Sequence, residues 1–366
     1  MSQTKAQLID TLVASLLPAS DSAVDIGSNG VRFANIYGDT LYGDGSNLTG
    51  ITSTTINSNA DNRVITGSGT ANTLNGESSL LFDGSMLTVN GIRVGKGTNA
   101  VAGNTALGLS ALDDSVSGGY NTAIGEQSMT ANTSGTENTA VGSRSLDANT
   151  TGNYNTAIGQ AALTNATTGS NNTAVGDDAL EANTTASNNT AVGQNSLASN
   201  TTGFNNVAVG NNALDANTTA NNNTAIGHGV LTSATTATEN TAVGRASMTN
   251  TTTGGYNVAL GNGSLYTNIT GANNVAVGRD ALLMSTASDN TAVGKHALAA
   301  NTTGNSLVAV GSGALDANTT ADNNTAVGYA ALGSNTTGTS NTALGQAAAT
   351  SVTTANDITA IGKRIS

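Results

Sequence analysis

Apolar and polar positions repeat with a period of 17 residues from residue 104 onwards. Aligned on an unvarying glycine, sixteen copies follow the consensus N-T-A-V-G-x-x-A-L-x-A-N-T-T-G-x-x, from the copy of Gly108 to that of Gly362. One step is 16 residues long, between Gly278 and Gly294. Disordered chains do not keep such a period. We therefore predict an all-β fold in which residues 104–366 form a parallel β-solenoid, or β-roll, of sixteen coils.

Strand alternation divides each "TAVG" segment between two faces, with Thr and Val on one face and Ala on the other. Thr is replaced by Val at Val207 and Val258, so this face tolerates apolar groups, and we expect it to be interior. We expect two short strands per coil and a core that includes the ninth-position Leu. The predicted core columns contain Val141, Val175, Val192, Val209, Leu146, Leu163, Leu180 and Leu197.

The opposite face holds the alanine that occurs in all sixteen copies. A coil with about two bulky side chains is a poor core for a free-standing chain. We therefore expect a homotrimer in which neighbouring chains pack through Ala174, Ala191 and Ala208.

The repeats contain many N-x-T sequons, such as those that begin at Asn149 and Asn171. In a secreted eukaryotic protein these are acceptors for glycans. Asparagine and threonine ladders and turns explain their repetition more simply.

Two segments precede the repeats. Residues 4–17 predict a helix that ends near Pro18, and Leu8, Leu12 and Leu16 lie on its apolar side. We assign residues 1–20 to a docking or trimerising element; the alternative is a helix that packs on its own domain. Residues 21–103 alternate short β-like runs with Gly, Asn and Asp turns and predict β-rich linker modules.

Composition limits the partners. The net charge is −12 without a basic run, so we expect no nucleic-acid or anionic-membrane partner. No cysteine is present, which excludes disulfides and thiolate metal sites. No apolar run reaches the roughly 20 residues of a membrane span, and no signal-peptide pattern is visible.

Candidate chemistry is sparse, and we predict no enzyme, cofactor or metal site. His228 and His296 both stand in the variable pair after the repeat glycine, which indicates exposed turns. "GIRVGKG" around Lys96 departs from the phosphate-loop spacing, and Gly97 replaces its hydroxyl residue. "YGDGSN" at residues 42–47 is read as a turn, with calcium binding as the alternative.

Aromatic side chains stand in the turn before the Asn strand, where they either contact host glycans or are scattered turn residues. They are Tyr120, Tyr154, Phe204 and Tyr256.

The "AIG" strand resembles the head repeats of trimeric autotransporter adhesins, whose repeat is shorter and forms a left-handed parallel β-roll trimer. Residues 25–51, "DIGSNGVRFANIYGDTLYGDGSNLTGI", and residues 59–91 resemble modules of bacteriophage tail fibres, especially from marine and cyanobacterial phages. This resemblance implies a trimeric, β-rich appendage for host contact. No chaperone, receptor-binding domain or autotransporter anchor is recognisable after the repeats, which argues against a true autotransporter.

The sequence thus predicts a structural subunit of a phage tail fibre, located on the virion, that contacts other virion proteins and a host glycan or protein. The alternative is a cell-made extracellular filament or adhesin subunit. The last coil, "DITAIGKRIS", lacks the usual Asn and Leu, and we expect it to abut either the N-terminal module of another copy, in a head-to-tail contact, or a tip protein. A polysaccharide-degrading tailspike would need a carboxylate cluster that the repeat does not supply.

Overall fold

The computed structural model describes residues 63–67, 74–82, 86–90 and 92–363, all within one compact unit, Asn57–Ser366. These described residues form strands and turns and contain no helix, so the fold is all-β as predicted. The predicted helix over residues 4–17, with Leu8, Leu12 and Leu16, lies outside the described residues.

Four strands precede the repeats: β1 (Arg63–Gly67), β2 (Leu74–Phe82), β3 (Met86–Val89) and β4 (Ile92–Gly95). Each pairs antiparallel with the next, and β4 pairs antiparallel with β5 (Thr105–Gly108). The first repeat strand therefore has a partner on the side that faces away from the later coils. The other repeat strands are β6 (Thr122–Ile124), β7 (Thr139–Val141), β8 (Thr156–Ile158), β9 (Thr173–Val175), β10 (Thr190–Val192), β11 (Val207–Val209), β12 (Thr224–Ile226), β13 (Thr241–Val243), β14 (Val258–Leu260), β15 (Val275–Val277), β16 (Thr291–Val293), β17 (Val308–Val310), β18 (Thr325–Val327), β19 (Thr342–Leu344) and β20 (Thr359–Ile361).

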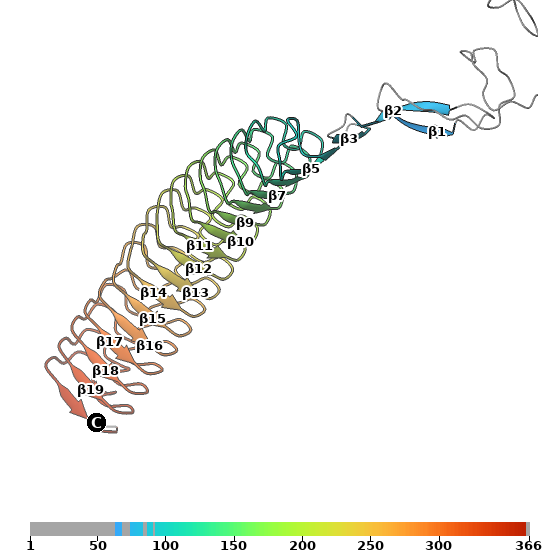
Figure 1. The fold of residues 1–366 in the computed structure, drawn as a ribbon. Helices are drawn as coiled ribbons and strands as arrows, with labels where there is room; N and C mark the ends of the chain where they lie inside the picture. Colours follow the sequence, from blue (N-terminus) through green and yellow to red (C-terminus); the bar gives the residue numbers. More distant parts are fainter. Residues whose placement is uncertain (1–62, 68–73, 83–85, 91, 364–366) are drawn as a thin grey trace, which may run out of the picture. The chain divides into compact units, whose positions relative to one another are not determined.

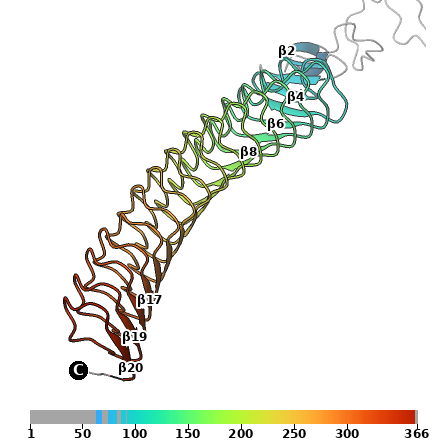
Figure 2. The same ribbon diagram turned by 90° about the vertical axis from the view of Figure 1, so that its left-hand side faces the viewer.

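Strands β5 to β20 stack in chain order as a parallel β-solenoid, which confirms the predicted architecture (Figures 1 and 2). Each coil contributes one strand, not the two expected, and turns make up the rest. Equivalent residues lie side by side, as in the pairing of Ala174 with Ala191. The 16-residue step leaves this register intact, because Ala276 still pairs with Ala292.

The middle residue of each strand points into the coil, which corrects the predicted orientation. Ala174, Ala191 and Ala208 are fully buried within their own chain, so they are not a packing surface between chains. The Thr and Val on either side point outward and are only half-buried. The prediction of a valine core was therefore wrong for Val141, Val175, Val192 and Val209. The interior is narrow, and at the strand it is occupied by alanine in every coil.

The ninth-position column is confirmed as the bulky part of the core. Leu146, Leu163, Leu180 and Leu197 are fully buried. Their φ angles lie between 51° and 53°, in the left-handed region that bulky residues seldom adopt. This conformation costs about 1–2 kcal/mol per residue, whereas burying a Leu side chain contributes about 1.5–3 kcal/mol. Burial thus keeps these leucines in an unfavourable backbone conformation.

A ladder of buried first-position asparagines joins successive coils. The side-chain oxygen of Asn172 accepts the backbone N–H of Asn189 at 3.0 Å, and that of Asn189 accepts the N–H of Asn206 at 2.9 Å. The side-chain amide of Asn189 donates to the carbonyl of Gly203, in its own coil, at 2.8 Å. Each asparagine therefore holds the next coil and closes its own turn. Leu307, fully buried, interrupts this ladder.

A second ladder runs through the twelfth position, as in the 2.9 Å bond from the side-chain amide of Asn149 to the side-chain oxygen of Asn132. The predicted asparagine ladders are therefore confirmed. Asn149 is fully buried, so its sequon is closed to modification in the folded chain, whereas Asn171 is exposed in its turn.

The second ladder breaks where the next coil lacks an asparagine. The side-chain oxygen of Asn217 is buried without a hydrogen-bond partner, and the next coil places Ala234 at this position. The same happens at Asn335, which Val352 follows. A buried acceptor without a donor costs about 1–3 kcal/mol, so these breaks are weak points of the stack.

The repeat glycine is required by a close approach between coils. Gly193 has a φ of +132°, and a Cβ added there would lie 2.6 Å from the carbonyl carbon of Gly210. No L-residue adopts this conformation without strain, and the contact is with backbone that cannot move aside. This explains why the glycine never varies among the copies.

Replacing Ala234 with asparagine should stabilise the chain by about 1 kcal/mol, because the new amide would donate to the unpaired oxygen of Asn217. The midpoint of urea unfolding measures this. Ala234→Leu is the control, since it adds similar volume without a donor and should destabilise. A lower midpoint for both variants would contradict the contribution assigned to the ladder.

Candidate interaction surface

The outward side of the parallel sheet forms a continuous charge-free surface, here called the outer sheet face. It consists of the second- and fourth-position side chains of β5 to β20. The second position is Thr or Val and the fourth is Val, Ile or Leu in every copy. Charged residues do occur on the neighbouring turns, for example Asp177, Arg245 and Lys295. This face itself carries no charge in any copy.

In-register neighbours cover part of each side chain on the outer sheet face. Most of these residues are half-buried, and the larger ones protrude, with Ile158 40% and Leu344 48% exposed. Contiguous apolar surfaces of this kind on an isolated chain mark interaction sites. Sequence reasoning found these residues but placed them inside the coil.

The aromatic side chains predicted for glycan contact lie at the surface. Tyr120, Tyr154, Tyr256 and Phe204 are all exposed. They stand in separate coils, and Tyr120 and Tyr154 have Glu137 between them in the same column. The structure therefore does not gather them into one site, and their contact with glycans stays a prediction.

A hollow of about 380 Å³ opens on the turns of the later coils and was missed by sequence reasoning. Tyr329, Asp316 and Lys295 line it, and Gly313 and Gly333 take the place of side chains that would fill it. A Cβ added at Gly313 would meet no atom within 4 Å. The sequence feature that could have indicated this hollow is the presence of Gly313 and Gly333 at variable repeat positions of two adjacent copies.

Backbone hydrogen bonds between coils fix the floor of this hollow. Gly313 donates its N–H to the carbonyl of Lys295 at 3.0 Å, and Ala330 donates to Ser312 at 2.9 Å. Ala317 donates to the carbonyl of Gly333 at 3.2 Å. The hollow is thus shaped by the solenoid's own ladder and is present without a ligand.

His296, which also lines this hollow, belongs to a small polar group. Its Nε2 atom is 3.3 Å from a guanidinium nitrogen of Arg279 and 3.4 Å from a carboxylate oxygen of Asp280. Across the described ranges, no group of three or more His, Cys, Asp or Glu side chains is placed to hold a metal ion. Residues 42–47 lie outside these ranges.

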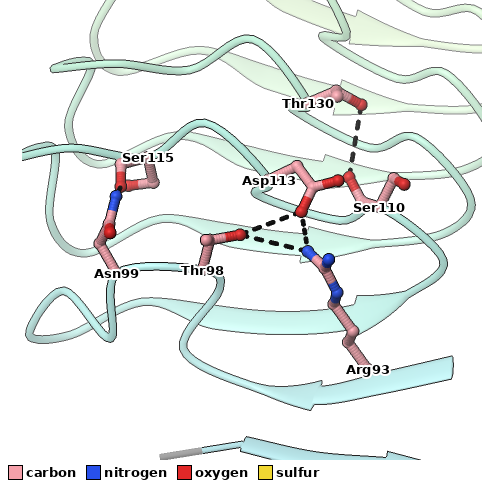
Figure 3. A network of polar contacts seen from close by, with 7 residues as sticks. All are labelled: Arg93, Thr98, Asn99, Ser110, Asp113, Ser115 and Thr130. Atoms are coloured by element: carbon pink, nitrogen blue, oxygen red, sulfur yellow. Dashed lines mark hydrogen bonds and ion pairs between the residues drawn. The ribbon is translucent and has the colours of Figure 1, made fainter. Parts of the chain in front are cut away.

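The segment around Lys96 is held against the first coil by polar contacts of its neighbouring residues. Arg93 of β4 forms an ion pair with Asp113 of the first coil, and Thr98 donates a 3.0 Å hydrogen bond to the same carboxylate (Figure 3). Asn99 donates to the carbonyl of Ser115 (Figure 3). These contacts attach the segment after β4 to the start of the solenoid.

Among the residues that the structure describes, Asp215 has a carboxyl whose titration the fold disturbs. Partial burial raises its pKa above the usual value, and backbone hydrogen bonds oppose this rise. Its Oδ1 atom is buried without a hydrogen-bond partner. Relative to the unfolded chain, folding therefore shifts the balance toward the protonated carboxyl.

Asp215→Asn should raise the unfolding midpoint at pH 7, because it removes a poorly solvated carboxylate. A raised folded-state pKa means that the contribution of Asp215 to stability is largest when the carboxyl is protonated and declines as the pH rises through the folded pKa. The gain from the substitution should therefore shrink at acidic pH. Asp147→Asn, at the same repeat position, is the control. A gain at Asp215 that does not change with pH would contradict this account.

Within the described residues there is no helix long and apolar enough to cross a membrane. Comparison with protein-family models, with curated proteins and with solved structures gives no match. The functional argument therefore depends on the geometry of the solenoid and its surfaces.

Proposed function

We propose that the chain is a non-enzymatic structural subunit of a fibre, a bacteriophage tail fibre in its most specific form. The observation that carries this is the outer sheet face, a charge-free surface that runs along all sixteen repeat strands. A solenoid with closely similar coils provides length and a repeated surface. A virion appendage uses both, as a spacer and as a host-contact element.

Self-association of this subunit takes place through the outer sheet face in our proposal. The alanines are enclosed in their own coils, so the sheet has only its outward Thr, Val, Ile and Leu side chains to offer another chain. Three parallel copies can turn this face toward a common axis, with equivalent coils at the same height. A homotrimer of this kind keeps every charged turn at the outside.

The size of the face supports association. Two outward side chains from each repeat strand expose on the order of 1,000 Å² per chain, against the roughly 800 Å² per partner of a standard stable interface. Such an interface would be apolar at its centre, which is typical of permanent oligomers.

The other interpretation, an extracellular filament or adhesin subunit, would use the same face for its trimers. The end-to-end contact through Leu8, Leu12 and Leu16 lies outside the described residues and stays a prediction. The tail-fibre interpretation draws its support from the resemblance of residues 25–51 and 59–91, which the structure describes only in part.

Placing lysines on the outer sheet face should break the oligomer. In Val175→Lys with Val192→Lys, ammonium groups from three chains would meet at an apolar axis, and unpaired buried charge is strongly unfavourable. Sedimentation velocity at micromolar concentration should show trimers for the original chain and smaller species for the variant.

The matched control is Asp177→Lys with Gln194→Lys, which puts the same residues on the turns of the same two coils and should leave the trimer intact. A stable folded monomer of the original chain would overturn the proposal. A dimer that the face variant disrupts would keep the interface and contradict the three-fold arrangement.

A further inference from the structure

We propose that the hollow lined by Lys295, Asp316 and Tyr329 binds a short segment of an uncharged saccharide. For its biological meaning the proposal rests on the proposed host-contact function. The site itself differs from the outer sheet face and from the aromatic residues of the turn before the Asn strand. It is formed by side chains of successive coils on another part of the coil surface.

The shape of the hollow suits a ligand of this size. Its volume of about 380 Å³ is at the lower end of the range for small-molecule sites, about 300–1,000 Å³, and has room for about two sugar rings. Gly313 and Gly333 form its base, and backbone bonds between coils hold that base in place. A site fixed in advance loses little entropy when it binds.

The side chains around the hollow match the two surfaces of a sugar ring. Tyr329 is 62% exposed and offers an aromatic face to the apolar C–H side of a pyranose. Asp316 accepts hydrogen bonds from hydroxyl groups, and Lys295 donates to hydroxyl oxygens. Ser312 and Ser334 add hydroxyls that do both.

These polar groups are available to a ligand. The side chains of Lys295, Ser312, Asp316 and Ser334 form no hydrogen bond with any other residue that the structure describes. The Arg279 guanidinium near His296 is already paired with Asp280 at 3.0 Å. Charge around the hollow is therefore close to balanced, with one free ammonium and one free carboxylate. This balance favours a neutral polyhydroxyl ligand over a phosphate or a polyanion.

Direct binding of defined tetrasaccharides to the full-length chain tests the proposal. Cellotetraose, mannotetraose and maltotetraose are the neutral probes and tetragalacturonate is the acidic one, each followed by saturation-transfer NMR and calorimetry. At least one neutral probe should bind, with a dissociation constant on the order of 1 mM. No binding by any neutral probe, or binding by tetragalacturonate alone, would overturn the assignment.

Two variants locate the binding. Gly313→Asn should fill the hollow, since asparagine tolerates the φ of +66° at this position and no atom lies within 4 Å of the new Cβ. Tyr329→Ala removes the aromatic face. Each should weaken binding at least tenfold without lowering the unfolding midpoint by more than a few degrees.

Gly229→Asn is the matched control, because Gly229 has the same repeat position, a φ of +64° and the same open space. Tyr266→Ala controls for an exposed tyrosine elsewhere. Both should bind like the original chain, and equal weakening by Gly229→Asn or Tyr266→Ala would overturn the site.

Sedimentation of the same samples separates the two proposals. Intact trimers that bind no neutral sugar would overturn this inference alone, whereas sugar binding by a stable monomer would overturn only the proposed assembly.

Discussion

Hydrogen bonds between identical asparagines in successive coils are the interaction on which this structure depends. Each first-position asparagine accepts the backbone N–H of the next, as Asn189 does for Asn206, and also donates to a turn carbonyl of its own coil. The ladder fixes the register of the strands and the width of the interior. Little apolar volume is then needed, which suits a chain with so few aromatic residues.

The narrow interior decides what the strands can present outside. Only alanine occupies the inward position of each strand, and the larger Thr and Val side chains lie outside. A coil of this kind buries its leucine column but leaves a row of β-branched side chains half-exposed. The outer sheet face is thus a consequence of the polar core, and it connects the fold to the proposed self-association.

The period, the parallel stacking, the leucine column and the asparagine ladders could be predicted from the sequence, because each recurs in most of the coils. The orientation of the strand could not. Alternation shows that Ala191 and Val192 lie on opposite faces but does not show which face is enclosed. Which face is enclosed depends on the volume that the buried Leu and Asn side chains leave inside the coil. That volume is defined only once the coil has closed. The hollow at Gly313 was hidden for a similar reason, since it arises from side chains of several coils that only stacking brings together.

The central claim is that alanines face the interior of the coil and valines face another copy of the chain. Because the chain has no cysteine, Ala191→Cys and Val192→Cys each introduce a single thiol, and oxidation followed by non-reducing electrophoresis reports which thiols meet. The account predicts disulfide-linked dimers from Val192→Cys and none from Ala191→Cys. Dimers from Ala191→Cys, or a reactive but uncrosslinked thiol in Val192→Cys, would contradict it.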